Sequence, residues 1–312
     1  MKPTALRYTP TAPGSKLIRV ISAHERRSYR NARRITTMSF KLRFLIVIIA
    51  ALATMAPVCV LSGGDTGTRS ESIELATGAV VEVIGENAEI RVRRAPFNTL
   101  KLEATLYNEE FVDFYTQAIT NDPVTRFVIS ATTSTGGTTS ASSLLEITIP
   151  EGIELIVRTT NHPIGIDGIT VSSASLATVD GKISVTRSTG DFDLHTTNSE
   201  VVVQQVNGLV DISTTNAHVW FDGVVSNGKN SISTTNGDIA VRLRNGSNVK
   251  VSGSTHNGDV SINGGDDGVV KNGDTATLEY QVGNGSADLS ISNGPGAIHI
   301  NPDSIAVFDG DS

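Results

Sequence analysis

The sequence predicts an all-β fold: a single-stranded parallel β-solenoid of about 18–21 residues per coil, preceded by an N-terminal signal or anchor segment. Aromatic residues make up only 5% of the 312 residues, while Gly, Ser, Thr, Asn and Asp are plentiful, as expected for many short strands joined by tight turns. A Thr-x-Asn/Asp motif also recurs at nearly constant spacing in the second half of the chain. A chain of this length can bury a substantial core in one or two domains.

Residues 1–43 form a strongly basic leader. They contain eleven Lys and Arg against Glu25 alone, a net charge of +10, so the rest of the chain carries −17 to give the total of −7. Residues 44–61, FLIVIIAALATMAPVCVL, follow without a charge. This order predicts a signal peptide h-region or a membrane anchor, with the acidic part extracytoplasmic. A basic segment can instead bind nucleic acid. The apolar run directly after it favours export, and we predict no nucleic-acid partner.

The sequence leaves open whether the apolar segment is cleaved or retained. Its eighteen residues are near the lower limit for spanning a bilayer, and Pro57 weakens a helix there. A chain that starts at Met38 would carry an ordinary signal peptide, and residues 1–37 would then not be translated. The only cysteine, Cys59, is either lipid-modified or, as the residues before it favour, an unmodified apolar-segment residue. The exported part therefore has no disulfide.

The repeats lie in residues 151–312, the predicted solenoid. Their Asn/Asp anchors are separated by 19, 18, 18, 20 and 21 residues, and Thr always stands two residues before the anchor. Asn and Asp tolerate left-handed backbone angles, and the Thr hydroxyl can bond a backbone group of the bend. We therefore predict these as structural corner residues: Thr159, Asn161, Thr178, Asp180, Thr196, Asn198, Thr214, Asn216, Thr234, Asn236, Thr255 and Asn257.

Apolar residues alternate with polar ones on both sides of each anchor. The buried face is predicted four and six residues before the anchor and three and five residues after it, so each repeat has two strands joined by a bend. A second turn is expected at Gly dipeptides such as Asn207-Gly208 and Asp222-Gly223. Like residues one repeat apart predict that successive repeats stack in register as parallel coils. An antiparallel meander is the alternative, because spacing alone does not fix strand direction.

The two flanks of the repeats are less regular. Residues 65–150 are predicted to form β-rich N-terminal coils or a cap, with strands at 80–83, 88–93, 100–107, 126–131 and 144–149. We also expect a short helical turn near 109–117 and a flexible Thr/Ser/Gly loop at 132–143. After the repeats the register lapses over 264–285. Alternation then resumes around Asn293, which predicts an irregular terminal coil that covers the exposed edge.

The sequence motifs of the repeats resemble those of a known family. The runs LLEITIPEGIELIVRTTN (144–161), STTNGDIAV (233–241) and STHNGDVSI (254–262) resemble the bacterial "putative adhesin" β-strand-repeat family, a domain of unknown function, over roughly 75–312. The resemblance implies a β-solenoid and brings no established catalytic residues. It implies surface binding by analogy only, because a fold does not fix a function.

No set of side chains predicts a catalytic, cofactor or metal site. The histidines of the repeats fall in different columns, and the Asn-Gly-Asp turns lack the calcium nonapeptide pattern. Asp191 and Asp193 share one strand face, but glycoside cleavage requires two carboxyl groups in different environments. Trp220 is predicted to project outward, where it either contacts a sugar ring or packs under a loop.

These observations predict an exported, membrane-associated, adhesin-like or structural binding module. Its partner is an unknown envelope or surface component, either glycan or protein, and the membrane is contacted through residues 44–61 if these are not cleaved. We predict no cofactor. The alternatives are a carbohydrate-active β-helix enzyme of the polysaccharide lyase or hydrolase type, and an accessory of envelope-stress signalling.

Overall fold

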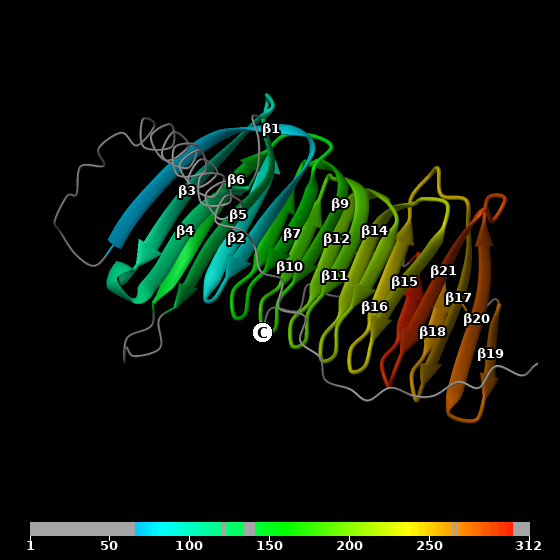
Figure 1. The fold of residues 1–312 in the computed structure, drawn as a ribbon. Coiled ribbons are helices and arrows are strands. Elements are labelled where there is room, and N and C mark those ends of the chain that lie inside the picture. Colours follow the sequence, from blue (N-terminus) through cyan, green and yellow to red (C-terminus); the bar gives the residue numbers. More distant parts are fainter. Residues whose placement is uncertain (1–65, 120–122, 134–140, 264, 266–267, 302–312) are drawn as a thin grey trace, which may run out of the picture. The chain divides into compact units, whose positions relative to one another are not determined.

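The structure is a computed structural model that describes residues 66–119, 123–133, 141–263, 265 and 268–301 (Figure 1). The predicted basic leader and apolar segment, residues 1–61, lie outside these residues. Among the described residues, no helix is long and apolar enough to cross a membrane.

The described chain is built almost wholly from strands. It contains twenty-two β-strands and one 3-10 helix, η1 (Glu109–Phe111). In chain order the strands are β1 (Thr66–Gly85), β2 (Ala88–Arg94), β3 (Thr99–Tyr107), β4 (Val112–Ile119), β5 (Val124–Thr133), β6 (Ser142–Ile149), β7 (Glu154–Arg158), β8 (Ile164–Asp167), β9 (Thr170–Ala177), β10 (Ile183–Thr186), β11 (Thr189–His195), β12 (Val201–Gly208), β13 (Val210–Ser213), β14 (Val219–Val225), β15 (Lys229–Thr234), β16 (Ile239–Leu243), β17 (Val249–His256), β18 (Val260–Ile262), β19 (Val269–Asn272), β20 (Thr275–Val282), β21 (Ala287–Asn293) and β22 (Ile298–Ile300).

The strands of the repeats form two parallel ladders. We term the strands before the corners (β7, β9, β11, β13 and β15) the first ladder, and the strands after them (β8, β10, β12, β14 and β16) the second ladder; one strand of each makes a coil. In the second ladder, Ile164, Ile183, Val201, Val219 and Ile239 lie opposite one another, one per coil. The first ladder is likewise parallel and in register. The predicted all-β, mostly parallel fold is confirmed, and an antiparallel meander is wrong for these strands.

The core lies between the inner faces of the two ladders. All the predicted inward positions are buried except Gly253, which falls where the other coils carry Leu, Ile or Val. Glycine is found at this position because the side chain of Leu278, from β20, fills the space that a larger residue would occupy. A Cβ atom on Gly253 would lie 2.9 Å from Leu278 Cδ2. Each fully buried aliphatic side chain contributes about 1.5–3 kcal/mol, so this continuous core is the main source of stability.

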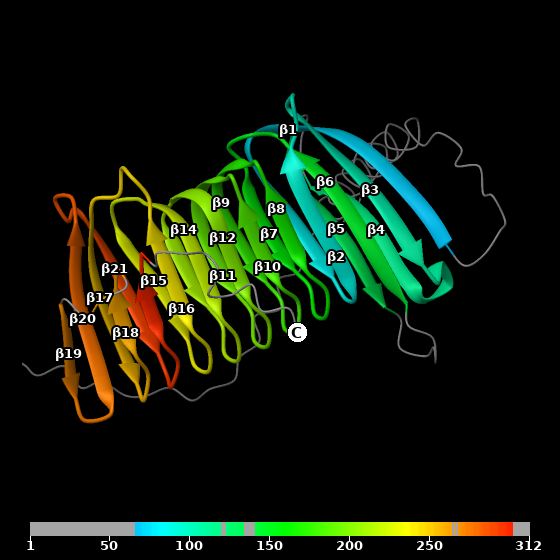
Figure 2. The same ribbon diagram turned by 180° about the vertical axis from the view of Figure 1, so that it is seen from behind.

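At the C-terminal end of the described chain, the coils do not stack in chain order. Strand β21 pairs in parallel with β15 on one side and β17 on the other, and β22 lies in the same way between β16 and β18. The last coil along the chain is therefore inserted between two earlier ones (Figures 1 and 2, β21 in red). The predicted terminal coil at this place and the predicted direct stacking of the last two repeats are both wrong. The segment whose register lapses supplies β19 and β20, an antiparallel pair that flanks β17 instead.

The N-terminal end shows the same arrangement. The coil made by β2 and the second half of β1 is inserted between β5/β6 and β7/β8. The first half of β1 pairs antiparallel with β3, and β4 pairs antiparallel with β5. The five predicted strands are present. The predicted helical turn at 109–117 is wrong beyond Phe111, because β4 begins at Val112.

Two predicted connections differ from the structure. The predicted loop 132–143 is shorter, because β5 extends to Thr133 and β6 begins at Ser142; residues 134–140 lie outside the described residues. Asn207-Gly208 and Asp222-Gly223, predicted as turns, lie inside β12 and β14. The pairing of β12 with β14 shifts register at Gln205, which has a left-handed φ of 58°. A bulge of this kind bends the strand without interrupting it.

Candidate functional site

The predicted corner threonines all lie inside the fold. Their relative exposures are between 1% and 6%. In most coils the Thr hydroxyl donates a hydrogen bond to the carbonyl oxygen that follows the anchor in the adjacent coil, as Thr234 does to Ala217 at 2.8 Å and Thr214 to Ser199 at 3.1 Å. Thr178 differs, since its hydroxyl group donates a hydrogen bond to the Thr160 carbonyl oxygen and accepts one from the Gly181 amide. These hydroxyls satisfy backbone groups that the bend would otherwise leave unpaired.

The anchor residues form a ladder of side-chain amides along the corner. Asn236 donates to Asn216 at 3.0 Å, Asn216 to Asn198 at 2.7 Å, and Asn198 to Asp180 at 2.6 Å. Asn161 donates in the same way to Asn87 of the inserted N-terminal coil. The corner residues line neither of the hollows described below.

Asn293 occupies a different place from the one predicted. It lies opposite Thr234 and Thr255, in the threonine column, and is 7% exposed. Counted from this register, Pro295 stands at the anchor position. Asn293 was mistaken for an anchor because the inserted coil replaces the column's Thr with Asn.

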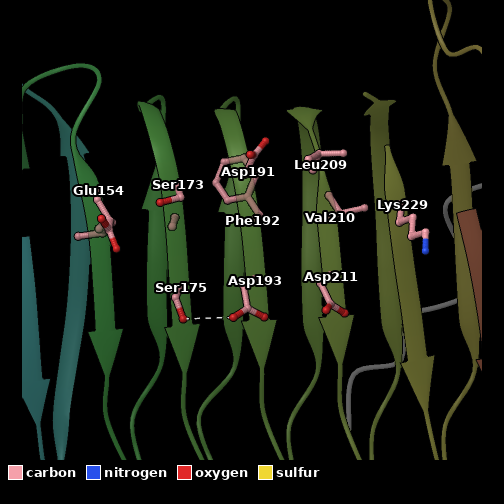
Figure 3. Close-up of a pocket in the computed structure, with 12 residues that line it drawn as sticks. Glu154, Ser173, Ser175, Asp191, Phe192, Asp193, Leu209, Val210, Asp211 and Lys229 are labelled. Atoms are coloured by element: carbon pink, nitrogen blue, oxygen red, sulfur yellow. Dashed lines mark hydrogen bonds between the residues drawn. The ribbon is translucent and has the colours of Figure 1, made fainter. Parts of the chain in front are cut away.

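Two hollows lie on the outer face of the first ladder and of the strands beside it, β21, β17 and β20. The first hollow has a volume of about 320 Å³. Figure 3 shows its polar residues projecting from neighbouring strands, with Ser175, Asp193 and Asp211 at the same height on β9, β11 and β13. Asp191 and Asp193, predicted to share one face, both line it, together with Glu154.

The carboxylates of the first hollow are partly engaged by neighbouring side chains. Asp193 accepts a hydrogen bond of 3.3 Å from Ser175, and its other carboxylate oxygen lies 2.5 Å from His195 Nε2 on its own strand. Asp211 accepts a hydrogen bond from Ser231. Sequence reasoning missed Asp211, although it stands five residues before its anchor, as Asp193 does. The recurrence of Asp five residues before the anchor in two successive repeats could have identified Asp211 from the sequence.

The second hollow, which we term the serine hollow, has a volume of about 570 Å³ and is lined only by polar and charged residues. These are Asp211, Lys229, Asn230, Ser231, Lys250, Ser252, Glu279, Asp288 and Ser290. Ser231, Ser290 and Ser252 lie opposite one another on β15, β21 and β17. Beside them, two residues earlier on each strand, Lys229, Asp288 and Lys250 make a second row of alternating charge.

Asn230 fixes the inserted strand beside the serine hollow. It is 4% exposed, and its amide nitrogen donates to the Asp288 carbonyl oxygen of β21 at 3.1 Å. Its side-chain oxygen accepts from the Val210 amide of β13 at 2.9 Å. Sequence reasoning missed the serine hollow, because its middle strand reaches this place only through the inserted coil.

Two ion pairs brace the outer face of the second ladder. Arg244 donates two hydrogen bonds to Asp222, at 2.6 and 2.7 Å, and the pKa of Arg244 is raised by this hydrogen bonding. The Asp222 side chain is only 6% exposed. At Asp167, the hydrogen bond from Thr186, at 2.7 Å, lowers the pKa of the carboxyl group; Arg187 lowers it further, while burial opposes both.

Of the two alternatives predicted for Trp220, an exposed sugar contact and a covered side chain, the structure has the covered one. Trp220 lies on β14 and is only 5% exposed, and the Arg242 guanidinium lies over its ring, 5.8 Å from the centroid. A cation at this distance is attracted to the face of the ring. Parity fixes the direction of a side chain but does not show what covers it, and the speculative surface contact at Trp220 has no support from a side chain this buried.

The predicted scatter of the histidines over different columns bears on metal binding. Among the described residues no group of three or more His, Cys, Asp or Glu side chains is arranged to hold a metal ion. His218, for example, accepts a hydrogen bond of 2.8 Å from the Asp238 amide.

The described strands define an all-β fold of mostly parallel strands, and several solved structures of bacterial putative adhesins are similar to it. A putative cell adhesion protein from Clostridium sporogenes covers 76% of this chain and 99% of its own at 12% identity, with a TM-score of 0.33. A putative adhesin from Bacteroides fragilis covers 75% of this chain and 97% of its own at 9% identity, with a TM-score of 0.39. A putative adhesin from Parabacteroides distasonis covers 76% and 98% at 10% identity, with a TM-score of 0.33.

These similarities concern the fold alone. The predicted resemblance to bacterial putative adhesins is confirmed at that level. No sequence-family model matches the chain, and no curated protein matches it in sequence.

Proposed function

We propose that the protein is an exported, membrane-associated, adhesin-like β-solenoid module of 18–21 residues per coil that binds an envelope or surface component through the outer face of its first ladder. The observation that carries this proposal is that face itself. Short polar side chains stand in register there on neighbouring strands; the first hollow lies on this face, and the second lies where the face continues from β15 onto β21 and β17. Such a face offers repeated hydrogen-bonding groups to a partner along the stack of coils.

Export is supported by the sequence of the leader. Residues 1–43 are basic, residues 44–61 are uncharged, and the remainder is acidic, which is the order of a secretory signal or signal anchor. Cell fractionation tests this part. Recovery of the protein in the cytosol, with residues 44–61 intact, would contradict it.

A binding role is favoured over catalysis because neighbouring side chains already engage two carboxylates of the first hollow. Asp193 is held by Ser175 and His195, and Asp211 by Ser231, all on one open face. Glycoside cleavage requires one carboxyl group with a raised pKa opposite a second, ionised one. We therefore propose that the hollows bind their partner without changing it.

Binding is tested with the full chain, purified in mild detergent and immobilised. It is exposed to the envelope fraction and, separately, to the cytosolic fraction of the cells that produce it. We expect retention of envelope material only. Equal retention of both fractions, or of neither, contradicts the proposed function.

A further inference from the structure

We propose that the serine hollow is a binding site for a neutral, linear polysaccharide. This inference rests on the proposed function and narrows it to one site and one class of ligand. The site is formed by three strands that are not consecutive in the chain, since β21 places Ser290 between Ser231 and Ser252.

The groups that line the hollow are available to a ligand. Within the described part of the chain, the side chains of Ser252, Ser290, Lys229 and Asp288 make no hydrogen bond or ion pair with the protein. Ser231 donates to Asp211 but keeps its acceptor capacity. A ligand that both donates and accepts hydrogen bonds is needed to satisfy this mixture. Sugar hydroxyl groups do both.

The charges of the hollow favour a neutral ligand. Asp288 stands between Lys229 and Lys250, so a polyanion that reaches both lysines meets a carboxylate between them. Asp211 and Glu279 also line the hollow, which gives three carboxylates against two lysines. A polycation would be repelled by the two lysines, and Lys250 already lies 3.8 Å from Glu279. Alternating charges of this kind suit neutral hydroxyl groups, which accept from Lys and donate to Asp.

The geometry favours a linear polymer that lies along the stack of coils. The three serines repeat at the strand spacing, so Ser231 and Ser252 are about 9.6 Å apart with Ser290 midway. No aromatic residue lines the hollow, and stacking on a ring is therefore not part of the binding. We expect weak affinity for a short oligosaccharide and measurable retention by a polymer, because a polymer in the gel presents many copies of the bound sugar sequence at high local concentration.

The test is affinity electrophoresis of the full chain in gels that contain barley β-glucan, galactomannan or dextran, with polygalacturonate as the anionic and chitosan as the cationic polymer. The variants are Ser290→Gln and Ser252→Gln, whose longer side chains fill the hollow. Their matched controls are Ser292→Gln and Ser254→Gln, on the same strands and the same face but outside the hollow. All four positions are exposed, so the fold is expected to persist.

We expect at least one neutral polymer to retard the wild-type chain and the two controls, and retention to fall by about fivefold or more in Ser290→Gln and Ser252→Gln. Retardation by the charged polymers alone, by none of the polymers, or to the same extent in hollow and control variants overturns the proposal. Retention of envelope material is measured on the same samples. If envelope binding persists while polysaccharide binding is absent, the site assignment fails and the proposed function stands; if envelope binding is absent, the proposed function fails.

Discussion

Asn293 Nδ2 donates a hydrogen bond of 2.8 Å to the carbonyl oxygen of Gly237, which joins the inserted coil to the coil of β15 and β16. The same side-chain nitrogen lies 3.1 Å from the Ala297 carbonyl oxygen within its own coil. Asn293 thus does for the inserted coil what the buried threonines do for the others. Five predictions follow from this arrangement of coils and their contacts.

Asn293→Ala should destabilise the protein, because it removes the side-chain donor to the Gly237 carbonyl oxygen and one of the two donors to the Ala297 carbonyl oxygen. We expect a loss of about 1–3 kcal/mol, measured as a lower urea midpoint by circular dichroism. Asn293→Thr should recover part of this loss, since a Thr hydroxyl makes the equivalent bond in other coils. The exposed neighbour Ser292→Ala serves as the control. A loss in Ser292→Ala as large as that in Asn293→Ala would contradict the role given to Asn293.

Thr214→Val tests the threonine column. Val has nearly the same shape but cannot donate to the Ser199 carbonyl oxygen, so we expect a loss of about 1 kcal/mol in the free energy of unfolding. Thr215→Val, at the exposed next position, should change stability by less than about 0.5 kcal/mol. Equal losses from the two substitutions would show that the buried Thr214 hydroxyl group does not stabilise the fold.

Arg244→Met should destabilise the protein by about 2–3 kcal/mol, because it leaves the buried Asp222 carboxylate without its partner. The double variant Asp222→Leu/Arg244→Met should be closer to the wild type in free energy of unfolding than Arg244→Met alone, since it removes both charges. Urea unfolding of the two single variants and the double variant measures the coupling. Strictly additive losses would argue against a coupled pair.

Asp167→Asn should remove a contribution that depends on pH. Because the pKa of Asp167 is lowered in the folded state, its carboxylate stabilises the fold fully above the unfolded pKa, about 3.9, and this stabilisation is lost as pH falls through the lower folded value. The side chain is 37% exposed, so we expect less than about 1 kcal/mol at pH 7. The difference between the urea midpoints of wild type and variant should shrink from pH 5 to pH 2. A difference that grows on acidification would contradict the assignment.

The repeats made much of the fold predictable. The alternation around each anchor identified the inward residues, and the buried threonines were named because they recur at one offset. The stacking order was not predictable in this way. The same residue types recur at the same positions of every coil, so they can align equally well whether the coils stack in chain order or with one coil inserted. Asn293 occupies the position of a Thr, and it therefore gave the wrong register for the last coil. The serine hollow was missed for the same reason, because Ser290 belongs to that coil. The sequence left open whether Trp220 is exposed or covered, because residues that contact it, such as Arg242, lie one coil away and not on its own strand.

Disulfide trapping tests the inserted coil most directly, and with it the origin of the serine hollow. In a Cys59→Ser background, three double-cysteine variants are oxidised and their linked peptides identified by mass spectrometry: Ser231→Cys/Ser290→Cys, Ser290→Cys/Ser252→Cys, and Ser231→Cys/Ser252→Cys. We predict that the first two pairs crosslink, because these residues lie opposite one another on paired strands. The third pair should not, because two strand spacings, about 9.6 Å, exceed the roughly 7 Å limit between Cα atoms for a disulfide. Efficient crosslinking of the third pair without the first would show that the coils stack in chain order and would contradict this account.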